Sequence, residues 1–141
     1  MKNKEFNGFN NKEELVAFTT FFKFTDFDSP DQRGSGELTM DRKFLSMLVK
    51  ARQIANVPFR INSGHRTLAY NNQLIKRGYK ASPVSSHIKG VAVDLSVKNN
   101  AERFFIVKAL MDAGFNRIGI GNTFVHVDLD NEKPKDVIWT Y

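Results

Sequence analysis

The sequence predicts an α+β domain with a mainly antiparallel sheet and flanking helices. Helical patterns come first along the chain, and strand patterns with helices between them dominate the second half. A Gly-Asn pair, a connection typical of hairpins, separates two of the strand patterns. A length of 141 residues is ordinary for a single domain. We therefore expect one domain over residues 1–141, in which residues 1–10 are allowed to be flexible.

Two helices are expected before Pro58. The first is marked by apolar residues at helical spacing, namely Leu15, Phe18 and Phe22. The second is marked in the same way by Phe44, Leu48, Ala51 and Ala55. Thr39 is the expected N-cap of this second helix, and Asn56 with Pro58 ends it. The intervening residues 23–38 are rich in Pro, Gly, Ser and Asp, so we expect a long surface loop there.

Strands and helices alternate after Pro58. Residues 58–63 are a short strand candidate, and residues 67–77 are expected to form a helix that opens at Thr67 and ends at Gly78. A strand is expected over residues 91–97. Asn99 followed by Glu102 has the form of a capping box, and opens a helix that ends at Gly114. The apolar positions of that helix are Phe104, Val107 and Met111.

The last third of the chain is expected to add three strands. Residues 117–120 and 123–130 flank the Gly121-Asn122 connection, and residues 137–141 supply a last strand. Period-two alternation gives each of the longer strands one aliphatic and one polar face. The polar face of 91–97 carries Ala92, Asp94 and Ser96. The corresponding face of 123–130 carries Phe124, His126, Asp128 and Asp130.

Composition narrows the classes of partner and of metal site. The net charge of +6 favours polyanionic partners, but no run of five basic residues and no basic patch with interleaved aromatic residues is present, so we expect no specific nucleic-acid binding. The sequence contains no stretch of eighteen apolar residues, so we expect no membrane insertion. Residues 1–14 also lack the apolar stretch of a secretory signal. We expect synthesis in the cytoplasm without a signal peptide. Because cysteine is absent, a metal would be held by imidazole and carboxylate.

The three histidines of the chain, at positions 65, 87 and 126, lie in unusual surroundings. His87 precedes Asp94 by seven residues, and Gly90 between them lets the backbone turn. If the strands of Asp94 and His126 are neighbours in the sheet, both side chains can reach one ion, and His87 can complete the group. Two imidazoles and one carboxylate are typical of catalytic zinc with an open fourth position. The alternative is a surface histidine beside an unrelated acid.

Four segments carry a resemblance to a known family: SGHRT at 63–67, Asn71, SSHIKGVAVDL at 85–95 and FVHVD at 124–128. From about residue 26 to Trp139 the chain resembles the zinc D-alanyl-D-alanine peptidases, especially their short members from bacteria and phages. The resemblance implies the small fold shared with the hedgehog signalling domain. It also implies one Zn²⁺ ion bound by His87, Asp94 and His126. The implied activity is hydrolysis of amide bonds in peptidoglycan peptides, as an endopeptidase or a D,D-carboxypeptidase.

Further site residues follow from the same resemblance. Arg66 matches the family arginine that pairs with a substrate carboxylate or carbonyl, or it is an ordinary surface arginine. His65 replaces the usual tyrosine, either as packing or as a substrate contact. Ser86 either orients substrate or caps a turn. The usual general base is missing at Thr123 and Phe124, so Asp128 is the candidate base, with orientation of His126 as its alternative role.

The expected partner is a stem or cross-link peptide of peptidoglycan. A short, single-domain chain fits a protein that acts on the cell wall. It would be a phage lysis protein, a wall-remodelling enzyme or a virion component. The competing hypothesis is a non-catalytic, zinc-containing wall-binding module, because the usual base is missing. The sequence predicts neither the bond that is cleaved nor the oligomeric state.

Overall fold

The computed structural model describes residues 5–141 and is an α+β domain, as predicted. Its described part contains five α-helices, one short 3-10 helix and a five-stranded sheet of order β1-β2-β4-β3-β5. The strands are β1 (Ile61–Ser63), β2 (Ala92–Ser96), β3 (Arg117–Ile120), β4 (Phe124–Asp128) and β5 (Val137–Thr140). The helices are α1 (Lys12–Phe21), η1 (Phe24–Phe27), α2 (Ser35–Thr39), α3 (Arg42–Ala55), α4 (Leu68–Lys76) and α5 (Asn100–Asp112).

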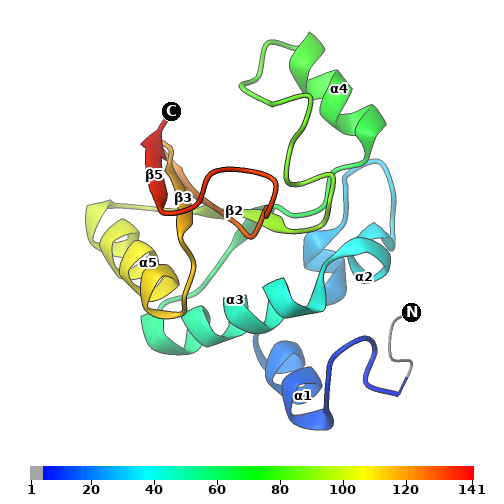
Figure 1. Ribbon diagram of the computed structural model, residues 1–141, viewed down its shortest axis with the longest axis vertical. Coiled ribbons are helices and arrows are strands. Elements are labelled where there is room, and N and C mark those ends of the chain that lie inside the picture. Colours follow the sequence, from blue (N-terminus) through cyan, green and yellow to red (C-terminus); the bar gives the residue numbers. More distant parts are fainter. Residues whose placement is uncertain (1–4) are drawn as a thin grey trace.

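The sheet separates a helical layer from a more open side. Helices α3 and α5 pack against each other on one side, with α1 against α3, whereas α4 lies on the other side of the strands (Figure 1). All neighbouring strands are antiparallel except β3 and β5, which are parallel. The aliphatic faces of β2 and β4 are fully buried, as the alternation predicted, through Val93, Leu95, Val125 and Val127. The polar faces of the same strands are therefore directed away from α3 and α5.

Helix α3 begins later than the sequence predicted. Its N-cap is Asp41, whose side chain accepts a hydrogen bond from the backbone N–H of Phe44, so Thr39 is not the cap. Thr39 is instead the last residue of α2. The predicted end is confirmed, because Asn56 is the C-cap in the left-handed conformation. Thr39 is still part of α2, so the cap of α3 lies two residues further along the chain, at Asp41.

The long surface loop predicted for residues 23–38 is wrong. The segment forms η1 and α2, and Phe27, the last residue of η1, is fully buried. The Asp28 carboxylate accepts hydrogen bonds from the backbone N–H groups of Gly34 and Gly36, at 2.9 and 2.8 Å. Side-chain acceptors of this kind replace the backbone partners that a short helix lacks, so a polar, glycine-rich stretch is folded tightly onto the core.

The N-terminal segment is attached to the same core. Phe9 is 1% exposed, Phe6 packs against the buried cluster, and the Phe9 ring lies 5.4 Å from that of Phe18 in α1. These two phenylalanines anchor the segment before α1 to the core, and the flexibility allowed for residues 1–10 stays a prediction. Residues 1–4 lie outside the residues that the structure describes.

Helix α5 is confirmed with Asn99 as N-cap, but its core face differs from the apolar spacing seen in the sequence. Phe104 and Met111 are exposed, whereas the buried residues are Ile106, Ala109 and Leu110. The predicted hairpin is also confirmed, with its turn shifted by one residue. Ile120 pairs with Val125, and the Gly121 N–H donates to the Phe124 carbonyl, so Asn122 and Thr123 form the connection. In residues 5–141, no helix is both long and apolar enough to cross a membrane.

Candidate metal centre

Asp94 and His126 are brought together by strand pairing. β2 and β4 run antiparallel, and Asp94 lies directly opposite His126 in their register. The two side chains project from the polar face of the sheet, and Nδ1 of His126 lies 2.9 Å from Oδ1 of Asp94. The predicted adjacency of these strands is therefore confirmed.

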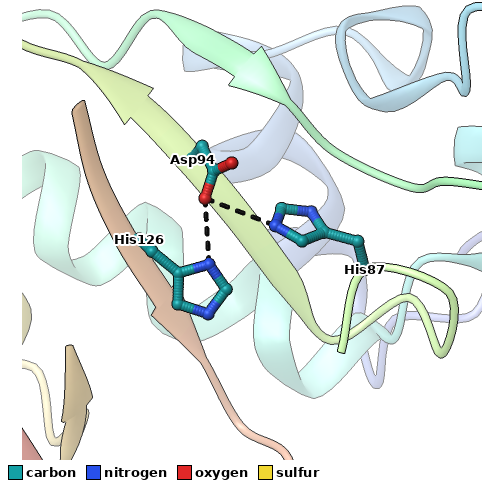
Figure 2. A group of neighbouring side chains, drawn as sticks. All are labelled: His87, Asp94 and His126. Atoms are coloured by element: carbon teal, nitrogen blue, oxygen red, sulfur yellow. Dashed lines mark hydrogen bonds and ion pairs between the residues drawn. The ribbon is translucent and has the colours of Figure 1, made fainter. Parts of the chain in front are cut away.

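His87 reaches the same carboxylate from the loop before β2. Its Nε2 lies 3.3 Å from Oδ1 of Asp94 (Figure 2). All three side chains are buried, and one donor atom from each lies within 4.8 Å of the others. Two imidazoles and one carboxylate at this separation are a donor set that suits zinc. The group could therefore hold a metal ion.

Each imidazole is oriented by a hydrogen bond to the nitrogen that faces away from Asp94. Nδ1 of His87 donates to the Gly64 carbonyl at 2.8 Å, which leaves Nε2 toward the group. Nε2 of His126 donates to Oδ2 of Asp128 at 2.7 Å, which leaves Nδ1 toward the group. Such partners fix the tautomer and ring orientation of metal-binding histidines. The donor atoms are thus directed at one point before any ion binds.

The electrostatics of the group suit a cation. Burial alone would raise the pKa of Asp94, but His87 and His126 hold it well below its usual range. Burial lowers the pKa of His87. For His126 burial acts in the same direction, but hydrogen bonds to Asp128 and Asp94 outweigh it and raise the pKa. The group therefore combines an ionised carboxylate and a neutral imidazole with a second imidazole whose raised pKa favours a proton, for which a metal would compete.

The backbone around His87 is held by close packing at two glycines. A Cβ on Gly64 would lie 2.6 Å from Cα of Phe27, so a side chain there would displace the carbonyl that orients His87. Gly90 has φ +74°, and a Cβ there would lie 2.3 Å from the Thr39 carbonyl oxygen. The Gly90 carbonyl in turn accepts from Asp41 N–H at the start of α3. Both glycines tie the histidine loop to the helical layer.

Arg66 contacts the group directly. Its Nη2 donates to Oδ2 of Asp94 at 3.2 Å, and its Nε donates to Oγ of Ser63 at 3.0 Å. The guanidinium thus binds Oδ2 of Asp94, the oxygen that faces away from the two histidines. Arg66 also lines the neighbouring cavity. Its predicted pairing with a substrate stays a prediction, and the contact with Asp94 is an additional role that the sequence did not suggest.

His65 points elsewhere. It is 7% exposed and is not among the described residues that line the cavity. Burial lowers the pKa of His65, and its backbone N–H donates to the Phe27 carbonyl. This placement favours the packing role over a substrate contact.

Asp128 has little freedom to act as a general base. Its Oδ2 accepts from His126, and its Oδ1 accepts from Nε of Arg117 at 2.7 Å and from the Asp130 N–H at 3.0 Å. The residue is 1% exposed. Burial would raise the pKa of Asp128, but the contacts with His126 and Arg117 hold it below its ordinary value. The geometry favours the alternative role, in which Asp128 orients His126.

Two residues that the sequence did not single out complete this side of the site. Arg117, in β3, donates to Asp128 and lies 5.0 Å from the Trp139 ring, whose centroid is 5.6 Å from that of His126. Trp139 fits beside β3 because Gly119 has no side chain, and a Cβ there would lie 2.7 Å from the indole. The sequence held one signal for Arg117. It lies two residues before Gly119 in a strand pattern, so the two residues share a face of the sheet.

A cavity of about 660 Å³ opens beside the three candidate ligands. Its walls come from the polar face of the sheet, from α4 and the loop after it, and from the aromatic residues Phe124, Trp139 and Tyr141. Ser86 also lines it, next to His87. Five basic and four acidic residues contribute to the lining, so the lining is slightly positive, and a bound divalent cation would make it more so. Its size and charge suit a small peptide with acidic groups.

The buried His–Asp–His group beside a peptide-sized cavity is consistent with a zinc site. Over residues 17–128 the chain matches the sequence profile of the peptidase M15 family. The chain belongs to this family, which is zinc-dependent, and membership implies a metallopeptidase. The comparison with curated proteins gives no match.

Proposed function

We propose that this chain is a zinc-dependent peptidase that hydrolyses amide bonds in the peptide part of bacterial peptidoglycan. The observation that carries the proposal is the buried group of His87, Asp94 and His126, whose donor atoms are oriented toward one point beside a cavity. Membership in the M15 family supports the same class of reaction. The wall peptide as substrate rests on the family resemblance and on the positive cavity.

His87, Asp94 and His126 would hold one zinc ion. When bound, the ion acts as a Lewis acid for the scissile carbonyl and lowers the pKa of a water molecule to about 7. The chain's own residues prepare this site before the reaction. Gly64 and Asp128 fix the histidines, and Arg66 fixes Asp94 through its outer oxygen. Because these contacts exist in the folded chain, little reorganisation is needed during the reaction.

The aromatic side of the cavity supports substrate positioning. Trp139 and Phe124 line the wall next to His126, and α4 faces them from the other side. A peptide lying between these walls would present its backbone to the candidate metal position. Confinement of this kind favours the reaction by holding the carbonyl in one orientation.

The role of Asp128 decides which group transfers the proton. If Asp128 orients His126, it remains hydrogen bonded throughout, and proton transfer falls to water inside the cavity. If Asp128 acts as the base, its Oδ2 must leave His126 during turnover. The first assignment agrees with the three hydrogen bonds that the carboxylate accepts.

The second candidate function is a non-catalytic, zinc-containing wall-binding module. It is favoured by one observation, namely that Asp128, the same-face acid closest to the candidate ligands in sequence, is occupied by Arg117 and His126. Both candidate functions place the protein at the cell wall, as a phage lysis or virion component or a wall-remodelling factor.

The two functions are separated by measuring new amino groups released from purified peptidoglycan. A peptidase releases them with zinc present, stops when a chelator removes the metal, and resumes when zinc is restored. The control is His126→Ala, which should release none. Sedimentation with the wall material and no release of amino groups would instead identify the binding module. Mass spectrometry of the digested peptides then identifies the bond that is cleaved.

A further inference from the structure

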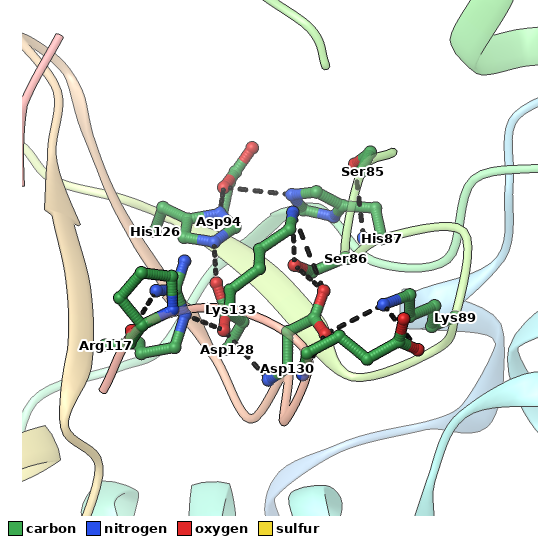
Figure 3. A network of polar contacts seen from close by, with 12 residues as sticks. Ser85, Ser86, His87, Lys89, Asp94, Arg117, His126, Asp128, Asp130 and Lys133 are labelled. Carbon is green, nitrogen blue, oxygen red and sulfur yellow. Dashed lines mark hydrogen bonds and ion pairs between the residues drawn. The ribbon is translucent and has the colours of Figure 1, made fainter. Parts of the chain in front are cut away.

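Two lysines bind Asp130 from opposite sides. Nζ of Lys89 donates to Oδ1 at 2.8 Å, and Nζ of Lys133 lies 3.6 Å from Oδ2 (Figure 3). Oγ of Ser86 donates to the same Oδ2 at 2.7 Å and accepts from Nζ of Lys133 at 3.1 Å. The Asp130 carboxylate is buried, and its hydrogen bonds with Lys89 and Ser86 lower its pKa to about 2 against the opposing effect of burial. Asp130 is thus an ionised anchor for both ammonium groups.

The two lysines differ in where they lie relative to the cavity. Lys133 and Ser86 line the cavity that also contains His87, Asp94 and His126. Lys89 is not among the described lining residues, and its second contact is the exposed Glu132, at 3.1 Å. Only Lys133 of this pair therefore brings its charge into the site. Nζ of Lys133 donates to Ser86, the residue directly before His87, so the charge lies on the His87 side.

Arg66 and Arg117 each already donate to a carboxylate of the site. Arg66 donates to Asp94 and Ser63, and Arg117 donates to Asp128 and the Pro134 carbonyl. An ammonium group has three N–H donors. Within residues 5–141, the described contacts of the Lys133 ammonium are those with Ser86 and Asp130. One N–H of Lys133 is therefore available to a ligand, whereas Arg66 binds the candidate ligand Asp94 and Arg117 binds Asp128, which orients His126.

We propose that Lys133, positioned by Ser86 and Asp130, binds a carboxylate of the ligand on the His87 side of the site. This specificity role rests on the proposed function, because for a peptidase the ligand is a peptide. The carboxylate is either the terminal one of the residue released or a side-chain one within the peptide. A fixed, partly buried ammonium discriminates a carboxylate from its neutral amide, since a charge-assisted hydrogen bond is about twice as strong as a neutral one.

The sole tryptophan provides a direct readout of ligand binding. Trp139 lines the cavity, 5.6 Å from His126, so its fluorescence reports on occupation without any turnover. Zinc-loaded protein is titrated with three probes: N-acetyl-D-alanine, its C-terminal amide, and N-acetyl-D-glutamic acid α-amide, which keeps only a side-chain carboxylate. Each titration is made with the wild type, Lys133→Met and the matched control Lys89→Met. Both variants remove one lysine from Asp130, but only the first changes the charge of the cavity.

The proposal requires that the wild type and Lys89→Met bind N-acetyl-D-alanine about tenfold more tightly than its amide. Lys133→Met should lose that preference while its thermal midpoint stays close to that of Lys89→Met, and Lys133→Arg should regain part of it. The wild type could instead bind the glutamate probe more tightly than the alanine amide. If Lys133→Met lost that difference, Lys133 would have the same role toward a side-chain carboxylate.

Equal affinity of the wild type for all three probes would overturn the proposal, and so would a preference that survives in Lys133→Met. The peptidoglycan assay is independent of this result. Selective binding without amino-group release would support the role of Lys133 and contradict the peptidase function. Amino-group release without selective binding would support the peptidase function and contradict the role of Lys133.

Discussion

Nε2 of His126 lies 2.7 Å from Oδ2 of Asp128, two residues further along the same strand. Residues i and i+2 of a strand point to the same face, so the sequence spacing alone makes the contact possible. The Arg117 guanidinium then holds the second oxygen of the carboxylate. The chain from Arg117 through Asp128 to His126 fixes which imidazole nitrogen faces Asp94.

Asp128→Asn is predicted to weaken zinc binding. The amide offers one acceptor and places N–H donors against either Arg117 or His126, so His126 loses its orientation. We expect the zinc affinity to fall about 10- to 100-fold, the range usual for an outer partner of a metal-binding histidine. Competition with a chromogenic chelator measures it. If turnover drops while zinc affinity stays unchanged, Asp128 is the general base instead.

Removing any candidate ligand is predicted to abolish hydrolysis and metal binding together. The variants are His87→Ala, Asp94→Ala and His126→Ala. Because these side chains lie on the polar face and the core side of the strands is unchanged, each variant should keep the circular dichroism of the wild type. Zinc should raise the thermal midpoint of the wild type only, since a ligand that binds the native state stabilises it. Near wild-type activity in any zinc-supplied variant would disprove the assignment.

Zinc affinity is predicted to increase with pH above the ordinary histidine value of about 6.5. In the metal-free protein the pKa of His126 is raised, so this imidazole keeps its proton to a higher pH than an ordinary histidine does, whereas the pKa of His87 is lowered. Zinc must displace the His126 proton. The affinity should therefore rise until the pH passes the raised pKa and then level off. Calorimetry in buffers of different ionisation enthalpy measures the protons released, and a value near zero at pH 7 would contradict the prediction.

The same His126 proton affects the stability of the metal-free protein. A raised pKa means that the folded state binds the proton more tightly than the unfolded state does. This contribution is fully present below the unfolded value of about 6.5 and is lost as the pH rises through the folded value. Denaturant unfolding of chelator-treated protein should show this loss, and Asp128→Asn should reduce it.

Gly90→Ala is predicted to destabilise the fold and weaken zinc binding. The new Cβ would meet the Thr39 carbonyl oxygen at 2.3 Å, and the residue would also retain φ +74°. Gly78→Ala is the matched control, because Gly78 has φ +84° but nothing within 4 Å of its Cβ. The control should lose about 1 kcal/mol of the free energy of unfolding, the penalty for a left-handed conformation. Gly90→Ala should lose about 3 kcal/mol or more. Equal losses would show that the contact with Thr39 yields easily.

The part of the site predicted best from sequence is the part determined by strand periodicity. Alternation in β2 and β4 placed Asp94 and His126 on polar faces, and the register then set them opposite each other. The period-two rule acts locally, so it can be read without knowing the tertiary structure. Arg117 and Lys133 escaped prediction because their partners are 11 and 47 residues away, at Asp128 and Ser86.

Short helices were the weakest part of the fold prediction. η1 and α2 contain too few residues to be stable alone, and their ends depend on the Asp28 carboxylate and on burial of Phe27. Similarly, the spacing of Phe104 and Met111 indicated a helix correctly but not its buried face, because the choice of face depends on α3.

The register of β2 and β4 determines both the packing of the interior and the position of the candidate metal ligands. Val93 and Val127 pair across β2 and β4, next to the pair formed by Asp94 and His126. Sliding one strand by a single residue would turn the imidazole or the carboxylate into the hydrocarbon layer and bring a valine to the cavity. Repacking experiments that enlarge or shrink these valines while keeping the strand alignment should thus alter overall stability without dispersing the donor atoms.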